Sequence, residues 1–387
     1  MSEPRRGSAP GHTGEPCHAP EPGPASEPRR AVEAGLAPDS GQAAKAPLTP
    51  KARHAAAPRS TAEPCNRPDL RRIDDPLHAP DPCHTPAPRR APAPDQVEWP
   101  TVALIGLVYL GWAGAVWGLA GLSPWLAVAV LVPLLTLQSS LAHEVLHGHP
   151  FPNQRLNAAL VTLPLGLFVP YARFRDLHLE HHRDADLTDP YDDPESNYLD
   201  PVVWLALPGW KRRLYRANNT LLGRMLLGPA IGTLAFLADD LRRIRRGERG
   251  LAATWGAHLV MCALVLWAAT RGGLGLWTYG LAAYGAFSVL KIRTFAEHRA
   301  HDRVRARTVI VEDRGPLAFL FLNNNLHVVH HMHPRAPWYA LPRLYAARAD
   351  HYRACNDNYV FAGYAQVFRH HFLAAKDPVP HPLWSRG

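Results

Sequence analysis

The fold is decided by the segment 99–147, which reads WPTVALIGLVYLGWAGAVWGLAGL over 99–122 and SPWLAVAVLVPLLTLQSSLAHEVLH over 123–147. Trp99–Leu122 is apolar almost without interruption, and a second apolar run extends from Trp125 to Leu141. Each run approaches the ~20 residues that a helix needs to cross a ~30 Å hydrocarbon layer. Gly121-Leu-Ser-Pro124 between the runs is typical of a tight turn. The segment therefore predicts a membrane hairpin.

A second pair of apolar runs occurs later, at Leu251–Thr270 and Leu274–Leu290, on either side of a short glycine turn. Buried helices of a soluble protein are the alternative, but they rarely come as two adjacent pairs of this length. We therefore predict an all-α integral membrane fold with four transmembrane helices in two hairpins. The apolar stretches Leu156–Ala172 and Leu221–Ala238 are interrupted by proline or arginine, so we expect them to lie in the membrane interface.

The positive charges predict the orientation of these hairpins. Lys211-Arg-Arg213, Arg242–Arg246 and the Lys291/Arg293 pair would all lie on one side, whereas the opposite turns hold only Arg271. Loops rich in lysine and arginine face the cytoplasm, so we expect both termini there, as in a bacterial cytoplasmic membrane protein. The same charge could bind nucleic acid. Because the clusters adjoin apolar runs, we expect them to meet anionic headgroups and no nucleic acid.

Residues 1–97 differ in composition from the rest of the chain. They contain 20 of the 39 prolines and none of the Trp, Tyr or Phe residues. A segment of this kind cannot bury enough apolar area to offset its ordering entropy. We predict a disordered tail over 1–97, a membrane domain over 98–375 and a flexible C-terminus over 376–387. No methionine lies between positions 1 and 225, so translation from Val97 is a further hypothesis.

Three histidine boxes carry the chemistry, and the hairpin model places all of them on the cytoplasmic side. On a helix, positions i, i+3 and i+4 share one face, so each box presents its imidazoles together. Eight imidazoles are too many for one tetrahedral zinc ion. They suit two metal ions with octahedral coordination. We therefore expect a cytoplasmic helical cap that holds a histidine-rich di-metal site. The box residues are His143 and His147, then His178, His181 and His182, then His327, His330 and His331.

These boxes, in this order and with apolar pairs between them, resemble those of the membrane fatty acid desaturase family, which is related to membrane hydroxylases and carotenoid ketolases. The resemblance covers about residues 99–375 and includes the flanks Asp184–Glu195 and His333–Tyr339. It implies a di-iron centre that uses O2 and two supplied electrons. It also implies a ninth iron ligand before the third box, and the matching position is His298.

The same resemblance implies the reaction and the partners. We expect an enzyme, an oxidoreductase that desaturates a fatty acyl chain, with electrons supplied by ferredoxin or by cytochrome b5 and its reductase. Three residues separate His143 from His147, whereas animal acyl-CoA desaturases have four, and Thr294 stands where those enzymes carry Asn. These departures favour a bacterial type of desaturase acting on a lipid-linked acyl chain. Hydroxylation or ketolation of an acyl or carotenoid chain is the alternative on the same iron chemistry.

A remoter alternative rests on His143-Glu144-Val-Leu-His147, which is the HExxH signature of zinc proteases with Glu144 as general base. That reading leaves both later boxes unexplained. We expect no catalytic residue beyond the metal ligands and no other cofactor-binding residue. Several carboxylates near the boxes could orient the imidazoles or could be ordinary solvated charge: Glu144, Glu180, Glu297, Asp184, Asp186 and Asp189. Asn323–Asn325 could hold a metal-bound water or cap the helix of the third box, and we favour capping. His149 lies two residues after His147 and would point elsewhere on a helix, so we do not favour it as a metal ligand.

Overall fold

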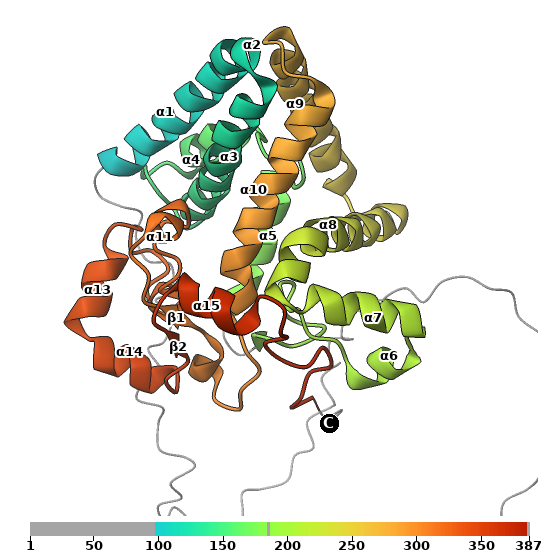
Figure 1. The fold of residues 1–387 in the computed structure, drawn as a ribbon, viewed down its shortest axis with the longest axis vertical. Coiled ribbons are helices and arrows are strands. Elements are labelled where there is room, and N and C mark those ends of the chain that lie inside the picture. Colours follow the sequence, from blue (N-terminus) through green and yellow to red (C-terminus); the bar gives the residue numbers. More distant parts are fainter. Residues whose placement is uncertain (1–96, 184–185, 385–387) are drawn as a thin grey trace, which may run out of the picture. The chain divides into compact units, whose positions relative to one another are not determined.

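The computed structural model describes residues 97–183 and 186–384, and the predicted disordered tail, apart from Val97, lies outside them. The described part is mostly helical, as predicted, and its strands are one pair of two-residue parallel strands. The long helices form its upper part in Figure 1, and short helices surround their lower ends.

The first hairpin consists of α1 (Trp99–Gly114), a π-helical segment (Ala115–Leu119), α2 (Ala120–Leu122) and α3 (Pro124–Leu146). Ser123 has extended backbone angles, and its Oγ accepts a hydrogen bond from the Leu126 amide, so the predicted turn ends one helix and caps the next. α3 continues past the apolar run predicted from its sequence. It therefore carries His143 on its last turn, and His147 caps its C-terminal end.

The second pair of helices is α9 (Leu251–Arg271) and α10 (Leu276–Ala296), and its tip packs against the tip of the first hairpin. A Cβ placed on Gly272 would lie 2.5 Å from the carbonyl oxygen of Val116, so only glycine allows this approach. Trp112 Nε1 donates to the Tyr279 hydroxyl at 2.9 Å, and that hydroxyl donates to the carbonyl oxygen of Leu165. Buried polar groups thus join the two hairpins.

Four described helical stretches are long and apolar enough to cross a membrane, as an integral membrane protein requires. Three match predicted spans, but the fourth is α8 (Leu221–Arg245), which we had expected to lie in the interface. The predicted fourth span falls in α10, whose Tyr279, Tyr284, Lys291 and Arg293 lower its hydropathy. α10 packs extensively between α3 and α8, so much of its surface faces protein. The four stretches are Trp99–Leu122, Pro124–Leu146, Leu221–Arg245 and Leu251–Arg271.

Short helices link the long ones and bring the histidine boxes together. α5 (Tyr171–His181) carries the second box and α12 (His327–Met332) the third. The strands β1 (Ile310–Val311) and β2 (Val360–Phe361) pair in parallel beside α12, and the Val328 amide donates to the carbonyl oxygen of Val309. The remaining helices are α4 (Gln154–Val161), α6 (Pro201–Ala206), α7 (Gly209–Asn218), the 3-10 turn Val304–Arg307, α11 (Pro316–Leu320), α13 (Leu341–Ala347), α14 (Ala349–Cys355) and α15 (Tyr364–His371).

The last described residues pack against the loop before α6. The Leu199 amide donates to the carbonyl oxygen of Val379, and the His381 amide donates to that of Leu199. Tyr198 donates to the Asp377 carboxylate at 2.7 Å. Residues 376–384, part of the segment for which flexibility was predicted, therefore make defined contacts beside the histidine-bearing end of the fold.

Candidate metal centre

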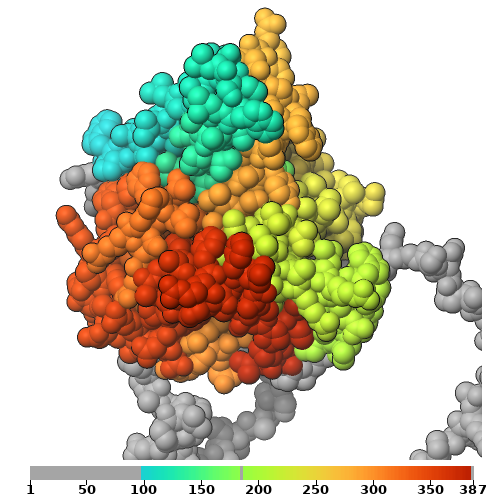
Figure 2. Space-filling view, viewed as in Figure 1, coloured from blue at the N-terminus to red at the C-terminus, as the bar shows by residue number. Residues whose placement is uncertain are grey.

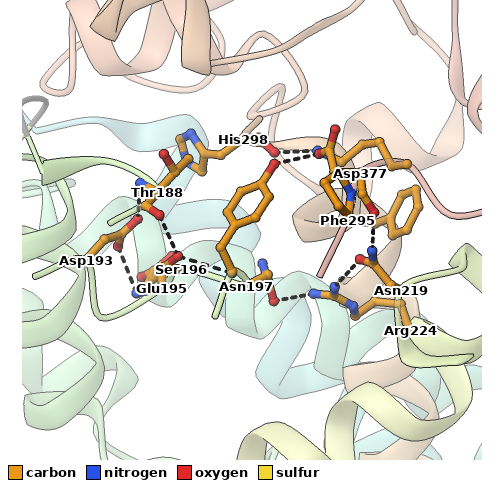
Figure 3. A pocket seen from close by; sticks show the side chains of 13 residues that line it. Thr188, Asp193, Glu195, Ser196, Asn197, Asn219, Arg224, Phe295, His298 and Asp377 are labelled. Carbon is orange, nitrogen blue, oxygen red and sulfur yellow. Dashed lines mark hydrogen bonds and ion pairs between the residues drawn. The ribbon is translucent and has the colours of Figure 1, made fainter. Parts of the chain in front are cut away.

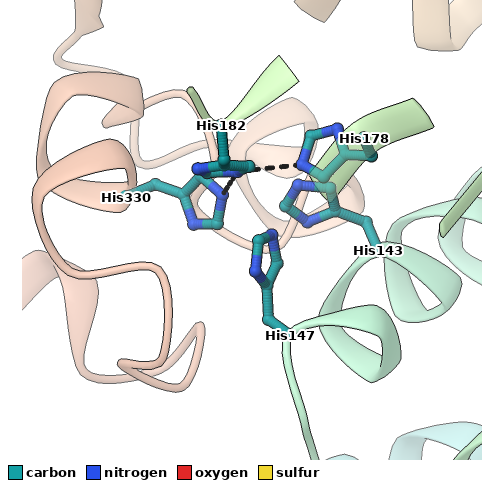
Figure 4. A group of neighbouring side chains, drawn as sticks. All are labelled: His143, His147, His178, His182 and His330. Carbon is teal, nitrogen blue, oxygen red and sulfur yellow. Dashed lines mark hydrogen bonds between the residues drawn. The ribbon is translucent and has the colours of Figure 1, made fainter. Parts of the chain in front are cut away.

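The structure brings all nine predicted histidines together, in two groups whose potential ligand atoms lie within 4.8 Å of one another. Segments far apart in the sequence contribute to each group. The first histidine group joins the end of α3, α5 and α12 (Figure 4). The second joins α5, α12 and His298, which lies two residues after the end of α10. The first contains His143, His147, His178, His182 and His330, and the second contains His181, His298, His327 and His331.

The ring nitrogens within each group face one another. In the first group, His182 Nε2 lies 3.0 Å from His178 Nε2 and 3.1 Å from His330 Nε2. In the second group, His298 Nε2 lies 3.0 Å from His181 Nε2 and 3.1 Å from His327 Nε2. Neutral imidazoles that point their lone pairs at a common point repel one another unless a proton or a cation lies between them. This geometry is what metal ligands require.

Buried ring nitrogens without hydrogen-bond partners also indicate a metal site. Among the described residues, Nε2 of His143 and Nε2 of His147 have no hydrogen-bond partner, although both atoms are buried. Buried nitrogens normally find a partner, because an unsatisfied one costs about 1–3 kcal/mol. A metal ion on these nitrogens removes that cost. The residues present therefore fit a pair of metal ions held by imidazoles.

The opposite ring nitrogens are held by acceptors that fix the orientation of three rings. Nδ1 of His178 lies 2.8 Å from Glu195 Oε1, and Nδ1 of His181 lies 2.8 Å from Asp193 Oδ1. Nδ1 of His327 lies 2.9 Å from Asn324 Oδ1. An Nδ1–H that donates to such an acceptor leaves the Nε2 lone pair free for a metal.

Electrostatics in the site follow from burial and from these carboxylates. Burial lowers the pKa of His182, His330 and His331 well below the usual value, which keeps these rings neutral. Burial alone would lower the pKa of His181 as well, but Glu195 and Asp193 raise it to about 9. Burial would raise the pKa of Glu195, but the rings of His181 and His178 hold it well below its usual value. Glu195 is therefore ionised at neutral pH.

Two of the orienting residues were not expected. Asp193 and Glu195 contact ring nitrogens of the second box, and their spacing from it follows no helical period that could have revealed them. Asn324, from the stretch singled out before the third box, contacts His327 three residues later. The Asp193 carboxylate is itself fixed by the amides of Thr188 and Glu195.

Of the carboxylates singled out from the sequence, Glu297 lies 3.9 Å from His327 Nδ1 and 2.8 Å from Arg293. Glu180 is exposed and lies 3.6 Å from Arg183. Asp189 accepts two backbone amides of its own turn. Asp186 makes a backbone turn with Arg183, and Asp184 lies outside the described residues.

Helix capping by Asn323–Asn325, the interpretation we favoured, is wrong. The N-cap of α12 is Leu326, and no side chain caps that helix. Asn323 donates to the carbonyl oxygen of Trp338, and Asn325 donates to that of Val311, because the chain turns sharply before the third box. The side chains of Asn323 and Asn325 therefore hold this turn, and Asn324 Oδ1 contacts the ring of His327.

His149 lies outside both histidine groups. Its Nδ1 lies 2.6 Å from Glu98 Oε1, and both residues are buried. Glu144 is engaged elsewhere as well, since its Oε2 accepts a hydrogen bond from the backbone amide of Trp338 at 3.2 Å. Both residues tie the first box to segments elsewhere in the chain.

Comparisons with known proteins agree with this geometry. Residues 123–361 match the fatty acid desaturase family. A β-carotene ketolase from Paracoccus sp. (strain N81106 / MBIC 01143) is 29% identical over 238 residues, which cover 59% of this chain and 83% of that protein. A β-carotene ketolase from Paracoccus sp. (strain PC1) is 27% identical over 238 residues, which cover 59% of this chain and 78% of that protein.

Proposed function

Because the chain belongs to the fatty acid desaturase family, we propose that it is a membrane oxidoreductase that uses O2 and a di-iron centre to desaturate a fatty acyl chain, carried on a membrane lipid. The observation that supports this proposal most is the convergence of nine histidines in two groups at the end of the long helices. We propose all nine as iron ligands. When bound, the two irons supply the activation of O2 that lets an unactivated methylene group lose hydrogen.

The protein's own residues would hold the metals in fixed positions. Asp193, Glu195 and Asn324 keep three rings turned with Nε2 toward the common centre of each group. The low pKa values of the buried rings keep their lone pairs available at neutral pH. Eight of the nine rings come from α3, α5 and α12 or from the residues that directly follow α3 and α5, so the centre is positioned by packed elements.

Orientation in the membrane is part of the proposal. The tips of the two hairpins lie at the end of the fold opposite to the histidine groups (Figure 1). Arg271 stands alone at the tips, whereas the basic clusters lie toward the other end. We place the histidine end and both termini in the cytoplasm of a bacterial cell, where soluble electron donors are available.

Ketolation of a carotenoid is the second candidate function. The observation that favours it is the similarity to two β-carotene ketolases, of which this chain covers 83% and 78%. Both candidates require the same metals, electrons and O2. They differ in which carbon of the substrate lies next to the iron, a difference in position that sequence similarity of this level does not fix.

Expression in a bacterial host that lacks such enzymes and makes β-carotene tests both candidates together. Mass spectrometry of the lipids should show acyl chains that have lost two hydrogen atoms. A carotenoid in which an oxygen atom replaces two hydrogens would instead support the second candidate. The matched control is His181→Ala, which removes one proposed ligand. If cells that express the wild type and cells that express this variant had identical lipid and carotenoid profiles, both candidates would be contradicted.

A further inference from the structure

His298 is held differently from the other eight proposed ligands. It lies two residues after the end of α10, outside any helix, and its ring Nδ1 is buried. The carbonyl oxygen of Arg307 is nearby, but no hydrogen bond of ordinary geometry forms with that nitrogen. Among the described residues, no side-chain acceptor therefore fixes the rotation of this ring as Asp193 fixes that of His181. The position of the ring depends on what holds the backbone of His298.

The backbone around His298 is held along two edges. On one edge, the residues before and after His298 exchange backbone hydrogen bonds with residues 307–309. Successive carbonyl groups of an extended chain point to opposite edges, so the carbonyl of His298 itself points away from that segment. The donor that it meets on the opposite edge is the side chain of Lys376, whose Nζ donates to the carbonyl oxygen of His298.

Lys376 is itself fixed by its surroundings. Its side chain is only 11% exposed, and its Nζ pairs with the Asp377 carboxylate at 2.8 Å. Nζ also donates to the Tyr359 hydroxyl at 3.2 Å, and this hydroxyl donates to the carbonyl oxygen of Ala296 at 2.7 Å. Hydrogen bonds from a charged donor are stronger than those between neutral groups. Lys376 therefore ties the end of α10 and the backbone of His298 to the C-terminal part of the chain.

Residues 376–384, which we call the C-terminal strap, are anchored beyond Lys376 as well. The Asp377 carboxylate accepts a hydrogen bond from the Tyr198 hydroxyl at 2.7 Å, and that hydroxyl accepts one from the Ala300 amide at 2.9 Å. Val379 is buried in a small apolar cluster at α6. In Figure 2 the red surface of the C-terminal segment borders the yellow-green surface of α6 and α7. The strap thus holds the chain both at His298 and two residues after it.

The strap also forms one wall of a small cavity beside the second histidine group. The cavity has a volume of about 30 Å³, with room for roughly two water molecules, and His298 lines it. Figure 3 shows Asp377 on one side of this site and Asp193 and Glu195 on the other. The strap therefore lies across the cavity from the two carboxylates that orient rings of the second box.

We propose that the C-terminal strap, through Lys376, positions His298 as a ligand of the second metal ion. The inference rests on the proposed function, because it requires that each histidine group holds an ion. Lys376 is a positioning residue that acts through the backbone of His298. The first histidine group is built from α3, α5, α12 and residues that directly follow α3 and α5, so its ion does not depend on the strap.

Binding of Fe2+ alone tests the inference without any turnover. The metal-free full chain, in detergent and without oxygen, is titrated with Fe2+, and the wild type should bind two ions. We expect K376M to weaken one of the two binding steps at least about tenfold and to leave the other unchanged. K376R keeps a charged donor and should restore most of the lost affinity. The matched control is K211M, because Lys211 also lies against an aromatic ring, that of Trp210.

Double variants identify the ion that is affected. His181→Ala removes a ligand of the second histidine group, so K376M should cause no further loss in H181A/K376M. His143→Ala removes a ligand of the first group, so H143A/K376M should bind both ions more weakly than the wild type does. Effects that act on one site fail to add, whereas effects on independent sites add.

Two results would overturn the inference. One is a K376M variant that binds both ions as tightly as the wild type. The other is a K376M variant in which both binding steps weaken equally, which is the outcome for a residue that only supports the fold. A wild type that binds fewer than two ions would instead contradict the proposed function.

Discussion

The backbone amide of Trp338 donates a hydrogen bond to the Glu144 carboxylate, with 3.2 Å between N and Oε2. This contact joins the first histidine box to the segment that follows the third box. Trp338 also donates from Nε1 to Thr101, whose hydroxyl donates to Glu98, which pairs in turn with His149. A buried polar network thus links the start of α1, the end of α3 and the turn after α12. Such a network holds separate elements in one arrangement when every member is paired.

Substitution of Glu144 tests whether this residue supports the fold or takes part in the reaction. Gln at this position keeps an oxygen that can accept the Trp338 amide, so we expect E144Q to retain iron and most of its activity. Glu144→Ala leaves that buried amide unpaired, at a cost of about 1–3 kcal/mol, and should lower the iron content. Iron analysis and product formation check both variants. If E144Q lost all activity while its iron was unchanged, Glu144 would have a role in the reaction that its contact with Trp338 does not explain.

Loss of the Asp193 carboxylate should weaken metal binding. Its Oδ1 holds His181 Nδ1 at 2.8 Å, and removal of such a partner typically costs 10–100-fold in metal affinity. We expect D193A to lose iron to a chelator at a concentration at least about tenfold lower than the wild type needs. The control is Glu180→Gln, since Glu180 is exposed and pairs with Arg183. Equal chelator resistance of D193A and the wild type would contradict the role given to Asp193.

The pH dependence of iron retention follows from the burial of the rings. A histidine binds metal only in its neutral form, and burial lowers the pKa of His182, His330 and His331. Protons therefore compete for these nitrogens only at pH values well below the usual histidine pKa of about 6.5. We expect the iron held by the first histidine group, which does not contain His181 with its raised pKa, to remain bound at about pH 6.5 and to be released as the pH falls further. Dialysis at a series of pH values measures this, and loss of both irons at or above about pH 6.5 would contradict it.

Most of the metal centre follows from sequence, because helical spacing alone predicts which imidazoles share a face. His178, His181 and His182 were expected to act together. All three lie in the site, but they divide between the two histidine groups. His178 and His182 belong to the first group, and His181, whose Nδ1 contacts Asp193, belongs to the second. Asp193 and Glu195 were not predicted as supports, because they lie in an irregular turn whose path depends on tertiary contacts. Asn324 was singled out as a helix cap or a holder of a bound water, but its contact with His327 was not predicted, because it depends on the turn formed by Leu322 and Asn323, both with positive φ.

Hydropathy predicted the number of candidate spans but not all of their positions. α10 was expected to cross the membrane because its first two turns and its middle are apolar, yet its tyrosines and basic residues reduce the average. Its packing between α3 and α8 explains why such residues are tolerated there. Whether a long helix can carry polar side chains depends on the helices that pack against it. A hydropathy average over one segment contains no information about those helices.

Contact between the two hairpin tips depends on a single glycine. A Cβ at position 272 would lie 2.5 Å from both the carbonyl oxygen and Cγ1 of Val116, so the two tips must move apart to admit it. We expect Gly272→Ala to destabilise the protein by about 1–3 kcal/mol, the usual cost of overpacking. Gly256→Ala in α9 is the control, because a Cβ there meets nothing within 4 Å. Thermal unfolding in detergent measures both, and equal midpoints would contradict the proposed contact.

Metal analysis of the purified full chain tests the central proposal most directly. Two bound irons per chain are expected. His143→Ala and His181→Ala, one from each histidine group, should each lower the iron content, and the exposed-site control Glu180→Gln should not. One zinc per chain, or an iron content that neither histidine variant changes, would contradict the di-iron account.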